Sequence, residues 1–332
     1  MHFNQKRCVP AKKQFPESGI IELFVLHLPV NTENMMKYEI NHGRLVIHTA
    51  GRYRNKTVED FLNEYCQSDR NQYLLIQNRQ ILVNDEPVRD VHQKLTDEDI
   101  TLLIPEEEYG WPCADQPCNV IYEDAFCYIV HKDAGYIIHD DANPEHCLMA
   151  MAAKWQDEHG IHVPVRPIHR LDRDTQGLVF FSKIPFFQPW FDRQLSEKKI
   201  QRHYLAIVKG KCPQDRFTCN GKIGRDRHRN GAFRISSTGQ EACTKVEKIA
   251  ARGPYTLLGC TLETGRTHQI RVHLADKGLP IVNDPLYGVK SKDFRIMGLW
   301  ADEIEFRSPL TNKKHKIHDI PVSEYDYFKG EK

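Results

Sequence analysis

The distribution of apolar segments along residues 119–309 constrains the fold of this chain more than any other feature. Apolar runs of strand length recur there, including NVIYED, CYIVHK, LVFFSK, HYLAIVKG, YTLLGCTLETG and GLWADEIEF. Helical spacing is confined to two stretches of this region, residues 147–159 and 188–198. Because the strands outnumber the helices and do not alternate with them regularly, the pattern favours a mixed α+β domain over a doubly wound parallel sheet.

A smaller unit precedes this domain. The segment KTVEDFLNEYC has helical spacing, residues 72–80 predict a second short helix, and the pair Asn84 and Asp85 predicts a turn between two short strands. A charged and then Gly- and Pro-containing stretch, residues 106–118, is typical of a linker. The sequence therefore predicts three parts: an N-terminal extension of residues 1–44, a small module of residues 45–108 and a larger domain of residues 109–325.

Asp172 stands out because charged residues surround it just before an apolar segment that predicts a buried strand. The run LVFF at residues 178–181 has the length of a buried strand, so the preceding charges belong to a loop at the edge of the core. Arg170 and Arg173 flank Asp172 and favour its ionised form. Gly177 permits unusual backbone angles in such a turn. The carboxylate can attack an electrophilic carbon or transfer a proton, and the alternative interpretation is a loop salt bridge.

Two further segments carry candidate site residues. Tyr204 begins the alternating strand HYLAIVKG, and that position is more often one of cross-strand packing. The segment LETGRTHQIRVHL places Arg266, His268, Arg271 and a second histidine around what the pattern predicts to be the exit of a strand. Arginine offers planar donors for carboxylate or phosphate. No carboxylate or cysteine lies at ligand spacing beside these histidines, so no metal is expected.

The charge distribution favours a polyanionic partner. Residues 165–275 hold 21 Lys and Arg against 9 Asp and Glu, a net charge of +12 in a chain of net charge +1. A basic face of this kind is typical of nucleic-acid binding, and a solvated surface is the alternative. The 10 cysteines form no C-x-x-C pair, and neither a signal peptide nor an apolar stretch long enough to span a bilayer is evident. We therefore expect a soluble cytoplasmic protein with reduced thiols and no membrane partner.

Five motifs resemble the RluA-type pseudouridine synthases. HRLDRDTQGLVFFSK is similar to the family signature H-R-L-D-x-x-T-S-G-L-L, whose aspartate matches Asp172. IYEDAFCYIVHKDAGYIIH, IQRHYLAIVKG and TGRTHQIRVHLADKGLPIVNDPLYG resemble the family's other motifs, and LWADEIEFRSP resembles its C-terminal one. The resemblance implies a mainly antiparallel central sheet of the pseudouridine synthase type. Residues 45–108 resemble an S4 RNA-binding module, although Asp85 and Glu98 occupy glycine positions and the stretch is not basic.

The resemblance implies an enzyme that converts specific uridines of rRNA or tRNA to pseudouridine without a cofactor. We expect a monomer, although the sequence itself carries no signal for the oligomeric state. The resemblance assigns catalysis to Asp172, Tyr204 and Arg271, with Arg271 as the ion-pair partner of the aspartate and Tyr204 stacked on the base. The implied substrate-binding residues are Arg170, Arg266, His268, Leu299, Lys198 and Lys199. Departures such as Gln176 for serine and Asp133 for proline leave the three catalytic residues in place.

Three alternatives stay open at this point. A non-catalytic RNA-binding or ribosome-assembly protein can retain the fold. A metal-dependent phosphohydrolase can use His139 and Asp140 with His169 and Asp172, which a metal analysis would test. The basic stretch GKIGRDRHRNGAFR, residues 221–234, is either a mobile solvated loop or an RNA clamp.

Overall fold

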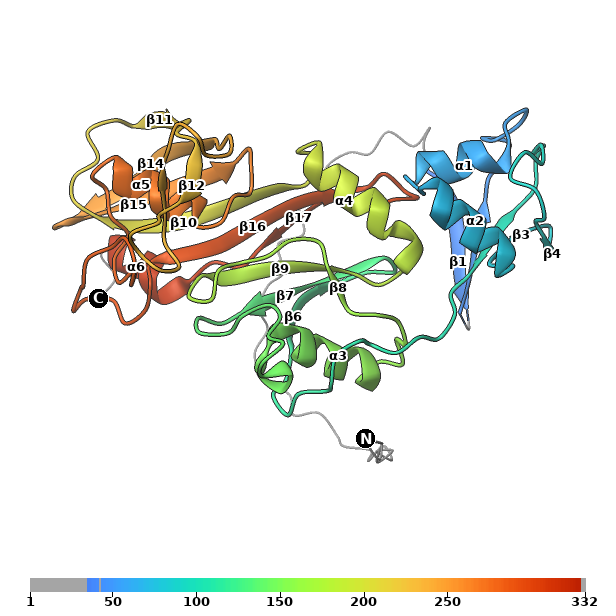
Figure 1. The fold of residues 1–332 in the computed structure, drawn as a ribbon, viewed down its shortest axis with the longest axis horizontal. Helices are drawn as coiled ribbons and strands as arrows, with labels where there is room; N and C mark the ends of the chain where they lie inside the picture. Colours follow the sequence, from blue (N-terminus) through green and yellow to red (C-terminus); the bar gives the residue numbers. More distant parts are fainter. Residues whose placement is uncertain (1–34, 42, 330–332) are drawn as a thin grey trace.

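A long twisted sheet forms the centre of the molecule (Figure 1). The computed structural model describes residues 35–41 and 43–329, so most of the expected N-terminal extension lies outside the described residues. The main path of the sheet runs in the order β11 (Arg216–Cys219), β14 (Thr244–Arg252), β15 (Tyr255–Leu262), β10 (Gln201–Lys209), β16 (Leu299–Arg307), β9 (Gln176–Ser182), β7 (Cys127–Lys132) and β6 (Asn119–Glu123). β17 (Lys314–His318) pairs with β16, and β8 (Arg166–Pro167) pairs with β9.

Every pair in this sheet is antiparallel except that between β16 and β9. The prediction of a mixed α+β fold with a mainly antiparallel sheet is therefore confirmed. The helices α3 (Leu148–Glu158) and α4 (Gln188–Ser196) lie where helical spacing predicted them, and α6 (Val322–Lys329) ends the described chain. Two short 3-10 helices, η2 (Pro144–His146) and η3 (Pro185–Phe187), precede α3 and α4.

Strand β9 explains why the sequence contains an unbroken apolar run. All of its residues are buried, with Val179 and Phe181 in one hydrophobic cluster and Leu178 and Phe180 in another. Successive side chains of a strand point to opposite faces, so a strand covered on both faces needs no polar alternation. The expected buried strand is confirmed, and it anchors the loop that carries Asp172 at the centre of the sheet.

The small module is a separate five-stranded sheet with two helices. The strand order is β1 (Lys37–Asn41), β2 (Arg44–His48), β5 (Ile100–Leu103), β3 (Ile81–Val83) and β4 (Glu86–Pro87), with α1 (Val58–Glu64) and α2 (Asp69–Gln77). Asn84 and Asp85 form the predicted turn, with φ values of 49° and 66°. β1 lies within the stretch predicted as an extension, so the expected boundary at residue 44 is too late for this sheet.

The module and the large sheet share one hydrophobic cluster. Phe61 of α1 stacks on Phe186 with 5.9 Å between ring centroids, and Tyr65 meets Phe187 edge-on at 5.3 Å. Gln67 Nε2 donates a hydrogen bond of 2.7 Å to the Phe186 carbonyl. This contact is apolar and continuous with the core, which is unlike the polar interface of a flexibly linked domain.

The predicted strand exit is confirmed because β15 ends at Leu262, but two local features were not predicted. One is helix α5 (Gln269–Asp276), which follows this exit and whose residues 269–274 are all buried. Because this helix has no exposed polar stripe, its apolar residues alternate along the sequence as they do in a strand. The stretch expected as a loop contains the paired strands β12 (Ile223–Arg225) and β13 (Phe233–Ile235), and we call residues 223–235 the basic hairpin.

No helix within the described ranges is long and apolar enough to cross a membrane.

Candidate active site

Asp172 lies in the loop between β8 and β9, residues 168–175, which we call the Asp172 loop. Its backbone carbonyl accepts a hydrogen bond of 3.2 Å from the Thr175 N–H, which turns the chain into β9. The side chain is 25% exposed, whereas that of Arg271, which contacts it, is only 4% exposed. A partly exposed carboxylate with a buried cation behind it is accessible to a ligand from one side only.

Gly177 fixes the exit of the Asp172 loop. Its φ is +103°, and a Cβ there would lie 2.2 Å from the carbonyl oxygen of Ala301 on β16. Gly177 and Ala301 are partners in the parallel β9–β16 pair. The expectation that Gly177 adopts an unusual backbone angle is confirmed, and the close approach of β16 adds a second requirement for glycine.

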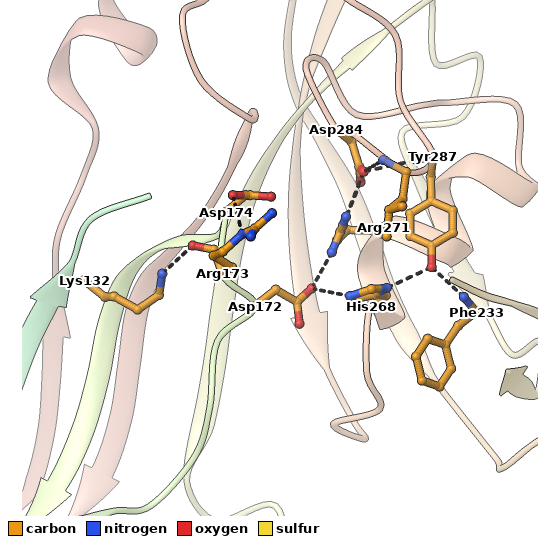
Figure 2. A network of polar contacts seen from close by, with 10 residues as sticks. Lys132, Asp172, Arg173, Asp174, Phe233, His268, Arg271, Asp284 and Tyr287 are labelled. Carbon is orange, nitrogen blue, oxygen red and sulfur yellow. Dashed lines mark hydrogen bonds and ion pairs between the residues drawn. The ribbon is translucent and has the colours of Figure 1, made fainter. Parts of the chain in front are cut away.

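Lys132 holds the Asp172 loop from behind (Figure 2). Its buried ammonium group donates hydrogen bonds to the carbonyl oxygens of Arg173 at 2.9 Å, Tyr136 at 2.8 Å and Asp133 at 3.0 Å. Burial lowers the pKa of Lys132 to about 8, although the nearby carboxylates, Asp174 foremost, oppose this shift. Lys132 therefore ties the end of β7 to the residue that follows Asp172.

Arg271 lies between two carboxylates. Nη1 donates to Asp172 Oδ2 at 2.9 Å, while Nε and Nη2 donate to the two oxygens of Asp284 at 2.7 and 2.8 Å. The Asp284 side chain is fully buried. Burial alone would raise the pKa of Asp284, but the hydrogen bonds and charge of Arg271 lower it below its ordinary value. Asp284 thereby fixes the plane of the guanidinium and leaves Nη1 for Asp172.

A histidine and a tyrosine complete this network (Figure 2). His268, which precedes α5 in a left-handed conformation with φ 57°, has Nε2 3.9 Å from Asp172 Oδ2. Its Nδ1 is 2.8 Å from the hydroxyl of Tyr287, and that hydroxyl accepts a 2.7 Å hydrogen bond from the Phe233 N–H. The guanidinium of Arg271 lies over the Tyr287 ring at 5.2 Å from its centroid.

Tyr204 lies on β10, on the face of the sheet that α5 covers. Its ring belongs to the same buried cluster as Leu171, Ile270 and Leu299. Leu171 and Ile270 are the neighbours in sequence of Asp172 and Arg271, so this cluster lies next to the ion pair. Burial raises the pKa of Tyr204, the Arg202 charge opposes this, and the Asp172 charge adds to it. The ring is therefore a neutral phenol at neutral pH.

The remaining predicted residues lie around this centre in different ways. Arg170 is exposed. Lys198 and Lys199 are exposed and form ion pairs with Glu263 at 2.9 Å and Glu197 at 2.7 Å. Arg266 is also exposed, and its Nε donates to the Glu241 carbonyl at 3.0 Å.

A groove of about 400 Å³ separates the basic hairpin from the loop before α5. Arg225 and Phe233 line it from the hairpin side, and Arg266 and Thr267 line it from the other side. Phe233 also meets His268 edge-on, with 5.4 Å between the ring centroids. Two arginines and an aromatic ring thus lie beside the network that ends on Asp172.

Sequence reasoning missed Lys132, Asp284 and Tyr287. All three lie in segments that resemble the family, Lys132 in IVHKDAGY and the other two in VNDPLYG. A signal was thus present, but the roles depend on contacts such as that of Asp284 with a residue 13 positions away.

The residues of the metal alternative do not form a ligand cluster. Among residues 35–41 and 43–329, no three His, Cys, Asp or Glu side chains are grouped as metal ligands would be. His139 packs edge-on against Trp111, with 6.5 Å between ring centroids. His169 is buried, and burial lowers its pKa to about 3, with the Arg202 charge adding to the shift.

Comparisons with known proteins agree with this fold. The family model described as RNA pseudouridylate synthase matches residues 127–276. The RNA pseudouridine synthase YhcT of Bacillus subtilis is 32% identical over 81% of this chain and 85% of its own length. YlyB of the same organism is 30% identical over 82% and 92%, respectively. Ribosomal large subunit pseudouridine synthase D of Xanthomonas campestris is 28% identical over 83% and 87%.

Solved structures share the fold. Human RNA pseudouridylate synthase domain containing 1 superposes with a TM-score of 0.50 at 21% identity, covering 66% of this chain and 97% of its own. Human RNA pseudouridylate synthase domain containing 4 superposes with a TM-score of 0.52 at 18% identity, covering 64% of this chain and 93% of its own. Fold and sequence together define an RNA pseudouridine synthase. The chain belongs to the RluA-type family of these enzymes, which isomerise uridine in RNA to pseudouridine.

Proposed function

We propose that Asp172 is the catalytic residue and that it acts on uridines of large-subunit ribosomal RNA. The observation that carries this proposal is the ion pair between Asp172 and Arg271 at 2.9 Å. Arg271 is itself fixed by Asp284, so one carboxylate is oriented by a buried cation and faces a partly exposed space. A simple loop salt bridge would not need this second, fully buried carboxylate.

The reaction breaks the N1–C1′ bond of a uridine, rotates the base and joins C5 to C1′. The C5 proton leaves and N1 gains a proton, so the product is an isomer and no co-reactant is consumed. The ribose carbon becomes electron-deficient as the N1–C1′ bond breaks, and an ionised carboxylate stabilises such a centre, as it does in glycosidases. Addition of Asp172 to C1′ and removal of the 2′ proton by Asp172 both use the same ionised carboxylate.

We assign two roles to Tyr204 in this reaction. The first role is stacking of its ring, which belongs to the buried cluster with Leu171 and Ile270, on the uracil. The second role is that of its ionised oxygen, which accepts the C5 proton after the new C–C bond has formed and becomes the neutral phenol. Because burial raises the pKa of this phenol, its ionised fraction is small at neutral pH and grows as the pH rises. Leu299 closes the apolar side of the same pocket.

The RNA must present an extruded nucleotide, because a stacked uridine cannot place its ribose against Asp172. Extrusion costs a few kcal/mol, which contacts with the surrounding RNA offset. We assign these contacts to the basic residues 165–275, with exposed Arg170 beside the site and Arg225 and Arg266 in the groove. Lys198 and Lys199 extend the basic surface along α4, although ion pairs partly neutralise both.

The module of residues 45–108 has less support as an RNA-binding unit. It holds 7 Lys and Arg against 13 Asp and Glu, a net charge of −6. Such a surface repels phosphates on average, so we assign most of the RNA affinity to the catalytic domain. Charge reversal of exposed Arg70 and Arg79 should then change the affinity less than twofold, whereas Arg225→Glu should weaken it about tenfold in filter binding.

The large-subunit rRNA assignment rests on the names of relatives such as that from Xanthomonas campestris. Pseudouridine mapping of all RNA from cells with and without the protein tests it. Loss of a site in large-subunit rRNA is expected, and loss confined to tRNA would contradict the substrate while leaving the reaction in place. We also propose a cytoplasmic location, which agrees with a ribosomal substrate, and a monomeric state; fractionation and light scattering test these two points.

The role of Asp172 is tested on purified protein with RNA labelled with tritium at uracil C5. Release of tritium measures formation of the C5–C1′ bond, and the Asp172→Asn variant should release none while it keeps its fold and most of its RNA affinity. Asp174→Asn is the matched control because Asp174 lies in the same loop, forms an ion pair with Arg173 at 3.5 Å and should keep its activity. Turnover by the Asp172→Asn variant would remove the central assignment.

A further inference from the structure

The basic hairpin contacts the loop of residues 284–287 at two points. The Phe233 N–H donates to the Tyr287 hydroxyl oxygen at 2.7 Å, and Arg229 Nη2 donates to the carbonyl of Leu286. Arg229 also lies over the Tyr287 ring, with its guanidinium carbon 6.0 Å from the centroid. A displacement of the hairpin would therefore be transmitted to the 284–287 loop.

The same loop reaches the catalytic carboxylate through two side chains. Asp284 holds Arg271, which donates to Asp172, and Tyr287 holds His268, whose Nε2 is 3.9 Å from Asp172 Oδ2. Both pathways converge on the same carboxylate oxygen (Figure 2). The 284–287 loop thus lies between the hairpin and the reacting group.

The hydrogen bonds of Tyr287 determine which nitrogen of His268 carries the proton. The Phe233 N–H can only donate, so the Tyr287 oxygen accepts there and its own O–H is available for His268 Nδ1. Nδ1 then accepts, and the proton of the neutral imidazole is on Nε2. That N–H faces Asp172.

A neutral His268 fits its surroundings. Burial lowers its pKa, the Asp172 charge opposes this, and the Arg271 charge adds to it. The ring is therefore uncharged at neutral pH and offers one donor beside the carboxylate. The 3.9 Å between Nε2 and Oδ2 is too long for a hydrogen bond but admits a hydroxyl that lies about 2.8 Å from both. Such a hydroxyl accepts from His268 and donates to Asp172.

We propose that His268 binds the 2′-hydroxyl of the extruded uridine, and that Tyr287 is a positioning residue that links this contact to the basic hairpin. The 2′-oxygen is attached to the carbon next to C1′, so a hydroxyl held by Oδ2 leaves Oδ1 beside the reacting carbon. RNA bound along the hairpin steadies Phe233 and thereby Tyr287 and His268. The proposal rests on the role of Asp172 given above and adds a recognised group of the substrate.

The first experiment measures turnover on RNA with ribose or 2′-deoxyribose at the target uridine alone. The wild-type enzyme should react about tenfold faster with the ribose substrate than the His268→Ala variant does, because one hydrogen bond is lost. The wild-type enzyme should prefer ribose to 2′-deoxyribose at the target uridine, and the His268→Ala variant should lose this preference. His268→Gln keeps a side-chain N–H near the Nε2 position and should restore part of that preference. An unchanged sugar preference in His268→Ala would overturn the proposal.

The second experiment tests Tyr287 with the Tyr287→Phe variant, which keeps the ring over Arg271 and loses only the hydroxyl. Long-range ¹H–¹⁵N NMR of histidine-labelled protein should show His268 protonated on Nε2 in the wild type and a mixture of tautomers in the variant. Its kcat should fall about tenfold with KM unchanged within about twofold. Tyr73→Phe is the control because Tyr73 is 63% exposed on α2.

The two experiments separate this inference from the role of Asp172. If Asp172→Asn is inactive but Tyr287→Phe keeps the wild-type tautomer, or loses only RNA affinity, the link through Tyr287 is wrong and the catalytic assignment stands. If Asp172→Asn turns over, the catalytic assignment itself fails.

Discussion

Arg271 and Asp172 are separated by 99 residues in the sequence, yet Nη1 of one lies 2.9 Å from Oδ2 of the other. The contact joins helix α5 to the loop before β9. Its geometry depends on Asp284, which binds the other two nitrogens of the guanidinium.

Asp284→Asn should therefore impair both stability and catalysis. Asparagine keeps the shape but removes the charge that balances buried Arg271, and breaking a buried pair costs about 3–5 kcal/mol of unfolding free energy. We expect kcat to fall about 100-fold with a smaller change in KM, because Asp172 loses its orientation. Urea denaturation and tritium release measure the two effects. Asp141→Asn, in an exposed loop, is the control, and wild-type kinetics in Asp284→Asn would contradict the positioning role.

Tyr204→Phe tests the proton-accepting role while it keeps the ring. Loss of a general base typically lowers the rate by about 100-fold or more. In the wild type, kcat should rise with pH above neutrality, because the raised pKa of Tyr204 keeps most of the phenol protonated at pH 7. The variant should lose this rise. Equal activity of variant and wild type would show that packing and stacking are sufficient.

Gly177→Ala should destabilise the fold by about 3 kcal/mol or more, because a methyl group would clash with β16 at a left-handed backbone position. Gly160→Ala is a matched control. Its φ is +66°, but no atom lies within 4 Å of the added Cβ, so only the backbone cost of about 1 kcal/mol remains. Thermal unfolding of both variants measures the difference, and equal losses would refute the close packing at Gly177.

His169 predicts a specific loss of stability in acid. Its pKa is lowered from 6.5 to about 3 in the folded protein, so between these values the unfolded chain binds a proton that the folded protein does not. Stability therefore falls as the pH falls below 6.5, by about 1.4 kcal/mol per pH unit from this group. His169→Gln should remove that part of the slope in urea denaturation between pH 7 and pH 5. If the slope of stability against pH is the same in His169→Gln as in the wild type, the pKa of His169 is not lowered in the folded protein.

The sequence predicted the strands of the large domain well because each is a compact apolar run, and β9 is recognisable even without alternation. Helix α5 was not predicted because burial on all sides removes the polar face that marks a helix. The Asp172–Arg271 pairing followed from family motifs, whereas the contacts of Lys132, Asp284 and Tyr287 did not, since backbone carbonyls and a tyrosine hydroxyl carry no pattern in the sequence. Long-range contacts of this kind appear only once the chain is folded.

The packing of Phe61 on Phe186 has a consequence for how any ligand of the small module is presented. Since the module continues the core of the large sheet, it holds its distance and angle to Asp172 as a fixed spacer does. A macromolecule that contacts the module and the reacting carboxylate together must itself match that separation. The fixed distance therefore restricts the shapes of the targets that can contact both.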